Sequence, residues 1–197
     1  LASIAGKRRV LKLLLRSGAR VDAVDKDGRT ALHHAAAWTN VRTAKDLIKF
    51  KSKVNAQATD GKTPLALAAY KGCSELVQMF IDNDAHPDLF DALGRRALYD
   101  AVFKGHQDCV DMLLRAGASQ ICLQTAENSL TALGLAIHNK RVHMVRFLAT
   151  HDLVDVNATF DFHDNRSALM LAVACDERQC VEALLQSNTL KLDIAFE

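Results

Sequence analysis

The chain has 197 residues, 49% of them hydrophobic and 24% charged, which is the composition of an ordinary globular protein of one or two domains. Its two prolines and nine glycines exclude a collagen-like or low-complexity chain, and its formal net charge of +2 is too small to predict nucleic-acid binding by itself. Its five cysteines show no C-x-x-C spacing, so we expect reduced thiols and an intracellular location, in the cytoplasm, the nucleus or both.

A spacing of 33 residues organises the chain. Gly28, Gly61 and Gly94 stand 33 residues apart, and eight of the nine glycines fall into three registers that share this period. Such repeats are typical of solenoids, in which each unit packs only against its neighbours. We therefore expect one repeat domain over residues 1–197, made of a partial repeat 1–24 and of repeats 25–57, 58–90, 91–123, 124–158 and 159–197.

Each unit is predicted to form a turn followed by two helices. The glycine of the turn permits a positive φ. Thr30 and Thr63 precede alanine-rich segments and are expected to cap the first helices, with Pro64 at the favoured first helical position. The first helix is built from small residues, so neighbouring repeats can approach closely. The second helix carries bulky residues such as Leu76 and Phe80, which are expected to form a continuous core.

Two units depart from this pattern. Arg96 stands where the capping threonine is expected, so that turn should lose its capping hydrogen bond. The unit 124–158 has no turn glycine, and we expect its turn to be distorted. Extra residues fall in the segments "LQTAENSL" and "TFDFHDNR", where additional loop length costs little entropy.

The unit "TDGKTPLALAAYKGCSELVQMFIDNDAHPD" follows the pattern D-x-x-G-x-T-P-L-x-x-A-A and continues into a second apolar helix. In these features the chain resembles the ankyrin-repeat family over essentially its whole length. The resemblance implies an all-α solenoid of helix–turn–helix units with projecting β-turn fingers. It also implies that His33, at the position of the family's histidine, braces neighbouring turns by hydrogen bonding. Because no polar capping repeat is evident at either end, we expect a monomeric segment with flanking repeats or domains.

The sequence offers little for cofactor, metal or catalytic chemistry. The segment "TDGKTP" imitates a phosphate loop, but Ala56 stands where the earlier glycine is needed. His33 and His34 are adjacent, so on a helix they point about 100° apart and are poorly placed to bind one metal ion. Two further pairs, His138 with His143 and Cys175 with Cys180, also have a spacing that is poor for binding one metal ion. We therefore expect no cofactor, no metal and no enzyme activity.

A cation follows each turn glycine, at Arg29, Lys62 and Arg95, and Arg166 holds the equivalent position later. If the repeats stack, these cations follow one another at about 10 Å. Lys26 adds charge, and neighbouring aspartates partly offset it. Such a row favours an acidic peptide or protein segment as partner, with the charges acting mainly on the association rate.

Three successive repeats carry an aromatic residue at the end of the first helix, Trp38, Tyr70 and Phe103, and Lys71 and Lys104 lie beside them. The resemblance implies that these positions face a concave groove where partners dock. Exposed aromatic residues beside cations are the composition of a binding hot spot. The alternative is that Tyr70 and Phe103 pack between repeats and only Trp38 is exposed.

The basic run "KFKSK", residues 49–53, ends a second helix on the convex side of the predicted solenoid. Cations complement the negative end of a helix, and we assign the run that structural role.

We therefore expect a non-catalytic protein–protein interaction module, part of a scaffold or adaptor, that binds an acidic protein or peptide through the concave groove. We expect no direct nucleic-acid contact and no membrane span. The alternatives are a regulatory ankyrin region of a larger enzyme or channel, a modified-peptide reader with an aromatic cage, and contact through the loops 124–130 and 159–166. The predicted partner-binding residues are Lys26, Arg29, Trp38, Lys62, Tyr70, Lys71, Arg95, Phe103 and Lys104.

Overall fold

The computed structural model describes residues 7–125, 129–160 and 166–187. The chain separates into two compact units, Leu1–Ala118 and Ser119–Glu197. Parts of the predicted repeats 1–24 and 159–197 lie outside the described residues. The grouping of all repeats into one domain stays a prediction.

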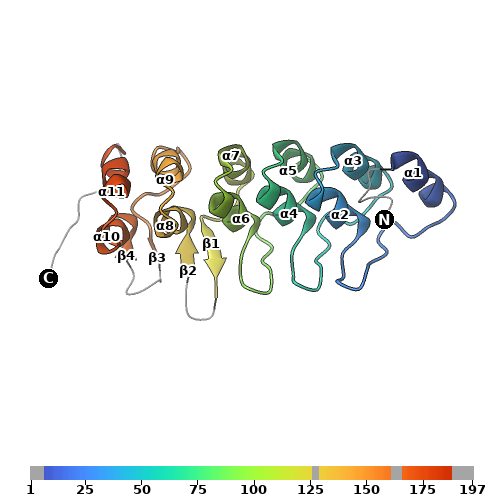
Figure 1. Cartoon of the computed structure of the whole chain (residues 1–197), viewed down its shortest axis with the longest axis horizontal. Coiled ribbons are helices and arrows are strands. Elements are labelled where there is room, and N and C mark those ends of the chain that lie inside the picture. The colour runs from blue at the N-terminus through green and yellow to red at the C-terminus, as the bar shows by residue number, and fades with distance from the viewer. Residues whose placement is uncertain (1–6, 126–128, 161–165, 188–197) are drawn as a thin grey trace. The chain divides into compact units, whose positions relative to one another are not determined.

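The helices of the first unit form two rows (Figure 1). The inner row, next to the projecting turns, consists of α2 (Ala31–Ala37), α4 (Pro64–Lys71) and α6 (Ala97–Lys104). The outer row consists of α1 (Arg8–Arg16), α3 (Val41–Lys49), α5 (Ser74–Ile81) and α7 (Gln107–Arg115). Consecutive inner helices pack against each other, and each packs on the outer helix that follows it. This arrangement confirms the predicted all-α fold of stacked helix–turn–helix repeats.

The predicted helix caps are confirmed. The Thr30 hydroxyl accepts a hydrogen bond from the backbone N–H of His33, and the Thr63 hydroxyl accepts one from Ala66. Pro64 is the first residue of α4. Arg96, at the N-cap of α6, makes no side-chain capping bond, as its place in the pattern predicts. A threonine cap stabilises a helix by about 1 kcal/mol, so α6 begins without that contribution.

Neighbouring fingers of the first unit are joined by backbone hydrogen bonds. Thr59 N donates to Asp27 O over 3.0 Å, and Ala92 N donates to Asp60 O over 2.9 Å. The approach is close enough that a Cβ on Gly61 would lie 2.8 Å from Ala92 N, and the φ of Gly61 is +78°. Glycine is therefore needed at this position both for the turn and for the contact between repeats.

His33 links two successive repeats, as predicted. Its Nδ1 accepts a hydrogen bond from Thr30 N over 3.1 Å, so its Nε2 carries the hydrogen and donates to Lys62 O over 3.0 Å. Burial lowers the pKa of His33, which keeps the imidazole neutral. A neutral ring in this tautomer ties the start of α2 to the next finger.

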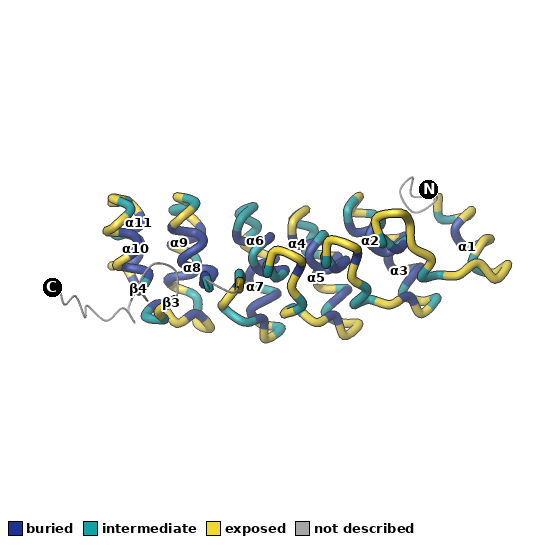
Figure 2. Tube along the Cα trace, turned by 90° about the horizontal axis from the view of Figure 1, so that it is seen from below, coloured by how far each residue is buried: buried dark blue, intermediate teal, exposed yellow. Residues whose placement is uncertain are grey.

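The core of the first unit lies between the two rows of helices, and Figure 2 shows the burial alternating along each of them. Full burial of one large apolar side chain contributes about 1.5–3 kcal/mol. The largest buried side chains of this unit include Leu32, Leu47, Leu65, Leu76, Phe80, Leu98 and Leu113.

The second unit repeats the helix pairs with hairpins in place of simple turns. Its helices are α8 (Ala132–His138), α9 (Val142–Ala149), α10 (Ala168–Ala174) and α11 (Arg178–Leu185). Strand β1 (Ile121–Gln124) pairs antiparallel with β2 (Ser129–Thr131), and β3 (Thr159–Phe160) pairs with β4 (Arg166–Ser167).

These hairpins are how the inserted residues are accommodated. The turn expected to be distorted in 124–158 is an antiparallel hairpin, in which Cys122 and Leu130 are buried. The Gln120 side chain fixes its base, because Nε2 donates to Leu153 O and Oε1 accepts from Asp155 N. Residues 126–128 and 161–165 of the two predicted loops lie outside the described residues.

Candidate protein-binding surface

The inner surface of the first unit is formed by the fingers and by α2, α4 and α6 (Figures 1 and 2). All nine predicted partner-binding residues lie on these elements. The structure shows which of them are exposed and which are held by other side chains of the chain.

The cation that follows each turn glycine lies against carboxylates of the next repeat or of its own finger. An Arg29 nitrogen lies 3.5 Å from an Asp60 oxygen. Arg95 is held more tightly, because its guanidinium lies 2.7 Å from Asp91 of the same finger. The predicted row of cations thus exists, but it is lined with carboxylates.

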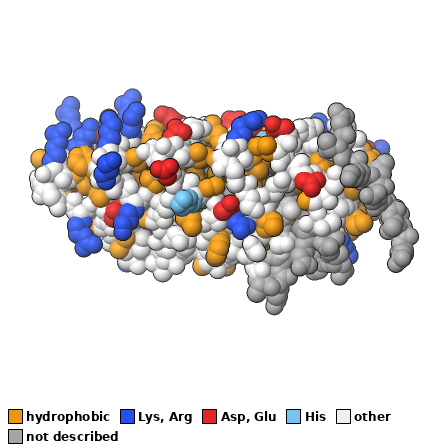
Figure 3. Space-filling model, turned by 180° about the vertical axis from the view of Figure 1, so that it is seen from behind, with side chains coloured by type: hydrophobic (Ala, Val, Ile, Leu, Met, Phe, Trp, Pro, Cys, Tyr) orange, Lys and Arg blue, Asp and Glu red, His pale blue; other side chains and the backbone are white. Residues whose placement is uncertain are grey.

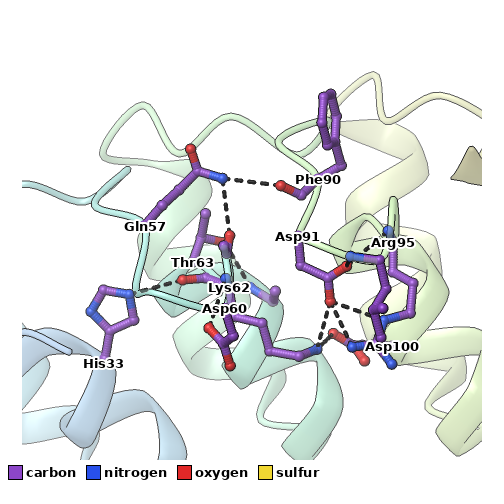
Figure 4. A network of polar contacts seen from close by, with 12 residues as sticks. His33, Gln57, Asp60, Lys62, Thr63, Phe90, Asp91, Arg95 and Asp100 are labelled. Atoms are coloured by element: carbon purple, nitrogen blue, oxygen red, sulfur yellow. Dashed lines mark hydrogen bonds and ion pairs between the residues drawn. The ribbon is translucent and has the colours of Figure 1, made fainter. Parts of the chain in front are cut away.

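Lys62 is the most enclosed member of the row, with 15% of its side chain exposed. Its Nζ lies 2.6 Å from Asp100 and 3.6 Å from Asp91 (Figure 4). Burial raises the pKa of Asp100, and the bond from Lys62 only partly opposes this rise. Burial also acts to raise the pKa of Asp91, but hydrogen bonds from the Arg95 side chain and backbone outweigh it and lower that pKa.

These four residues, Lys62, Arg95, Asp91 and Asp100, carry two positive and two negative charges at neutral pH. The cluster is therefore electrically matched within the chain. Its clearest role is structural, since it joins the finger before α4 to the finger and helix of the next repeat. A buried cation whose charge is already matched contributes little attraction to an acidic partner.

Three lysine side chains surround the ring of Tyr70. The Nζ atoms of Lys104, Lys71 and Lys62 lie 4.4, 5.9 and 6.0 Å from the centre of its ring. A hydrogen bond from Lys104 to the phenol lowers the pKa of Tyr70. No carboxylate ion pair is found for Lys71 or Lys104 within residues 7–125, 129–160 and 166–187. Their charges are therefore available to an anion.

Phe103 stacks on Tyr99, which is not among the predicted partner-binding residues. Its ring lies 5.8 Å from that of Tyr99 and nearly parallel to it, and the Arg95 guanidinium lies 5.7 Å from the Tyr99 ring. In the 33-residue lattice Tyr99 falls in line with His33 and with an alanine, which gave no aromatic signal. Its spacing of four residues from Phe103 on one helix is the feature that could have indicated the pair.

Trp38, the C-cap residue that follows α2, is 61% exposed, and Tyr70 is 37% exposed. Phe103 is partly exposed, so neither it nor Tyr70 is enclosed between repeats. The alternative in which only Trp38 reaches solvent is therefore wrong. Lys26 is exposed on its finger.

An aromatic cage for a modified lysine finds no support in this geometry. The Tyr70 ring is already surrounded by ammonium groups of the chain itself, which repel a further cation. Asp100, the carboxylate closest in sequence to Phe103, is buried and bound to Lys62. The arrangement suits an anionic group better than a cationic one.

The described part of the chain contains no group of three or more His, Cys, Asp or Glu side chains that could hold a metal ion. No helix among the described residues is both long and apolar enough to cross a membrane.

Two family models match the chain. One, described as ankyrin repeats in three copies, covers residues 39–125 and 119–194, and the other, described as ankyrin repeats in many copies, covers residues 1–48. Together the two models cover residues 1–194 of the 197-residue sequence.

Curated relatives share this segment within much longer chains. The chain is 30% identical to an ankyrin repeat and KH domain-containing protein of Caenorhabditis briggsae, over 100% of this chain and 8% of the relative. It is 29% identical to human Rabankyrin-5, over 81% of this chain and 14% of that protein. It is 34% identical to a zebrafish (Danio rerio) putative palmitoyltransferase, ZDHHC13, over 70% of this chain and 22% of that protein.

Proposed function

Since this chain belongs to the ankyrin-repeat family, a family of generally non-catalytic protein-interaction modules, we propose that it binds an acidic protein segment through its inner surface. The proposed contact is centred on Tyr70, Lys71 and Lys104, with Trp38 as an apolar anchor beside them. In this role the chain is a segment of a scaffold or adaptor.

One observation carries the proposal. Lys71 and Lys104 stand on successive inner helices around a partly exposed tyrosine, and their charges are not matched by carboxylates of the described chain. The row of Arg29, Lys62 and Arg95 is matched, so the attraction for an acidic partner comes from the end of the inner helices and from Lys26 rather than from the row.

In this proposal Trp38 and the lysines contribute to binding in different ways. Trp38 offers a large, rigid, exposed surface, and burial of such a side chain is a common source of binding free energy at interfaces. Lys71, which is exposed, and Lys104, which is half-buried, lie at the rim of the proposed contact, where charge mainly speeds association and makes it sensitive to salt. We expect a partner that places one apolar side chain on Trp38 and acidic residues over Lys71 and Lys104.

The experiment begins with selection of a displayed library of random linear peptides on the chain. We expect enrichment of Asp and Glu beside an apolar residue. Emission from Trp38, the only tryptophan, then reports binding directly, and the same peptides are titrated by anisotropy against W38A and K71Q/K104Q. W38A is expected to weaken binding about tenfold or more, which corresponds to about 1.4 kcal/mol. K71Q/K104Q is expected to slow association and to reduce the dependence on salt.

A matched control is R42Q/K45Q, which removes two exposed cations from the outer side of the chain and should leave peptide binding unchanged. Selected peptides without acidic enrichment, or equal binding by W38A and the unaltered chain, would show that the inner surface is not the contact.

A regulatory role within a larger protein is the second candidate. The matched relatives include a palmitoyltransferase and a cation channel homologue of Caenorhabditis elegans, and the chain spans 22% and 15% of their lengths. If the chain belongs to such a protein, the same inner surface is the place for a regulatory contact. Deletion of residues 1–197 from that longer protein, with its activity measured before and after, tests this role.

We also propose an intracellular location, because all five cysteines are free thiols in the structure. Burial raises the pKa of Cys109 to about 11, which keeps that thiol protonated and unreactive.

A further inference from the structure

Positive charge is concentrated in the first part of the described chain. Residues 7–53 contain thirteen Lys and Arg and four Asp, a net charge of +9, whereas the whole chain has a net charge of +2. The remaining residues are therefore acidic on balance. The weak overall charge, on which the expectation of no nucleic-acid contact rested, conceals this separation.

Six of these cations occupy matched positions on two neighbouring outer helices. Arg9, Lys12 and Arg16 of α1 stand 33 residues before Arg42, Lys45 and Lys49 of α3. We call these six residues the outer basic face. At the same positions α5 carries Glu75 and Gln78 and has Asp82 as its C-cap, and α7 carries Asp108, Asp111 and Arg115. The face is therefore limited to α1 and α3, and the outer surface becomes acidic beyond it.

Five of the six side chains are free to meet a ligand. Arg9, Arg16, Arg42, Lys45 and Lys49 are exposed, and no carboxylate partner is found for them among the described residues.

The one acidic residue of α1 and α3, Asp46, does not neutralise the face. Its carboxylate is only 4% exposed and lies beneath the surface, bound by Arg8 at 2.7 Å and by Lys12 at 3.2 Å. The hydrogen bond from Arg8 lowers the pKa of Asp46, so the carboxylate stays charged and its charge is matched by these two residues. Figure 3 shows Lys and Arg side chains gathered at the end of the first unit that α1 and α3 form.

The spacing of the cations gives the face a definite size. Positions i, i+3 and i+7 lie on one side of a helix and span about 10 Å along it. Neighbouring packed helices are separated by about 8–10 Å. Lys51 and Lys53, both exposed, follow α3 and extend the positive charge beyond the helix. The result is a dense array of cations that measures about 10 Å along the helices and about 8–10 Å across them.

The face lacks the features that a protein partner needs. Among the described residues, α3 exposes no large apolar side chain, and the three that α1 exposes, Val10, Leu13 and Leu14, correspond to buried positions of α3. A protein contact usually depends on buried apolar or aromatic anchors, whereas binding of a duplex backbone depends on phosphate contacts alone.

A membrane surface is also less well matched. The exposed apolar residues of α1 are Val10, Leu13 and Leu14. Their counterparts in α3, one repeat later, are Thr43, Asp46 and Leu47, which are buried. Asp46 binds residues of α1, so this side of an outer helix is directed toward the preceding helix. The apolar residues of α1 are therefore centred on the side of that helix that is directed away from α3, next to the side that carries the cations.

We infer that the outer basic face binds the phosphate backbone of a nucleic-acid duplex without reading its sequence. The inference is independent of the proposed function, which uses the inner surface. Nonspecific binding of this kind has a Kd on the order of 10⁻⁴–10⁻⁶ M at physiological salt, and each phosphate contact contributes about 0.9 to the slope of log K against log salt. With five free cations the expected slope is about −4.5.

The test uses a fluorescein-labelled duplex of arbitrary sequence, titrated by anisotropy with the 197-residue chain between about 50 and 200 mM salt. The variant R42Q/K45Q/K49Q removes three contacts, so its slope is expected to be shallower by about 2.7 and its affinity at the lowest salt at least about tenfold weaker. The matched control K26Q/K71Q/K104Q removes the same charge from the inner surface and should bind the duplex like the unaltered chain. Thermal unfolding by circular dichroism establishes that both variants are folded.

Three results would overturn the inference: no measurable binding at the lowest salt, equal loss of affinity in both variants, or tighter binding to vesicles of phosphatidylserine and phosphatidylcholine than to the duplex. The last result would assign the face to a membrane. The variant K26Q/K71Q/K104Q changes only the inner surface, and R42Q/K45Q/K49Q changes only the outer basic face. A failure of duplex binding can therefore be distinguished from a failure of acidic-peptide binding.

Discussion

Lys62 and Asp100 belong to successive repeats, and their Nζ and Oδ2 atoms lie 2.6 Å apart in a site that is almost closed to solvent. Asp91, only 3% exposed, lies 3.6 Å from the same ammonium group. A lysine that the sequence offers as a binding residue is thus the charge that allows a carboxylate to be buried between repeats. This pairing makes Lys62 a determinant of stability.

The variant K62M is expected to lower the free energy of unfolding at neutral pH by about 3 kcal/mol, because it leaves Asp100 buried without its counter-ion. Urea denaturation followed by circular dichroism measures the change. The pKa of Asp100 is already raised by burial, and loss of Lys62 raises it further. Because a raised pKa in the folded state favours the protonated form, the deficit of K62M should shrink as the pH falls through that pKa and be largest above it.

The double variant K62M/D100L is the control for this interpretation. The preceding repeat carries Leu67 at the position of Asp100, so an apolar residue is compatible with the fold there. The double variant should recover most of the lost stability, and its deficit should not depend on the pH. A double variant as unstable as K62M would mean that Lys62 contributes packing rather than charge.

Asp25 predicts a second, opposite dependence on pH. A backbone hydrogen bond from Arg29, with further bonds from His34 and Asp27, lowers the pKa of Asp25 to about 2. A lowered pKa in the folded state contributes stability that is present above the ordinary value and is lost as the pH falls from about 4 toward 2. In D25N this acid-dependent loss should be smaller, as measured by urea midpoints at each pH. D27N removes the same charge from the same finger and should keep the loss. Identical acid profiles for D25N and the unaltered chain would contradict the assignment.

Much of the fold follows from the lattice, because each cap and turn depends on residues close together in the sequence. Thr30, Thr63 and Pro64 act where they were expected, and Arg96 fails to cap as expected. The pairing of Lys62 with Asp100 joins residues 38 apart. It could not be predicted from the pattern because the equivalent positions carry His34 in one repeat and Leu67 in another.

The exposure of the aromatic residues on the candidate surface could be predicted from the sequence, but the balance of charge there could not. Trp38, Tyr70 and Phe103 reach the surface as the register indicates. Whether a cation is available to a partner depends on which carboxylates the neighbouring repeat brings to it, and that is a property of the packed structure. The outer basic face shows the converse case. The 33-residue spacing between its cations can be seen in the sequence. The side of each helix that carries these cations can be assigned only from the buried residues of α3.

Thr39 offers a gain of stability. It occupies the lattice position of Gly72 and has a φ of +52°, a left-handed conformation that is costly for a β-branched residue. T39G is expected to raise the free energy of unfolding by about 0.5–1 kcal/mol. This is the net gain that remains when the entropy that glycine adds to the unfolded chain is subtracted from the relief of backbone strain. Urea denaturation measures the gain, and T39A, which keeps a Cβ, is the control. Equal stability of the two variants would indicate that the backbone relaxes without strain.

Gly72 itself makes the reverse prediction. Its φ is +69°, and a Cβ there would lie 2.5 Å from the His106 ring, whose Nε2 lies 3.2 Å from Tyr70 O. G72A is expected to lower the free energy of unfolding by about 1–2 kcal/mol, because both the left-handed backbone and the contact are unfavourable for alanine. The variant G72A/H106A removes the contact but not the strain, so chemical denaturation should show it to be less destabilised than the two single changes added together. Strict additivity would place the whole cost in the backbone.

The titration of Tyr70 tests the cluster that supports the proposed function. The hydrogen bond and charge of Lys104 lower the pKa of Tyr70, with a smaller contribution from Lys71. In K104Q the pKa of Tyr70 should therefore rise toward its ordinary value of 10.0, whereas in K104R, which keeps a cation, it should stay lower. The chain has two tyrosines, so the measurement is made by ultraviolet absorbance of the tyrosinate in a Y99F background. If a bound acidic peptide draws Lys104 away from the phenol, the same titration in its presence shows a higher pKa. A Tyr70 titration that is the same in K104Q and K104R would remove Lys104 from the cluster and with it the central contact proposed for the partner.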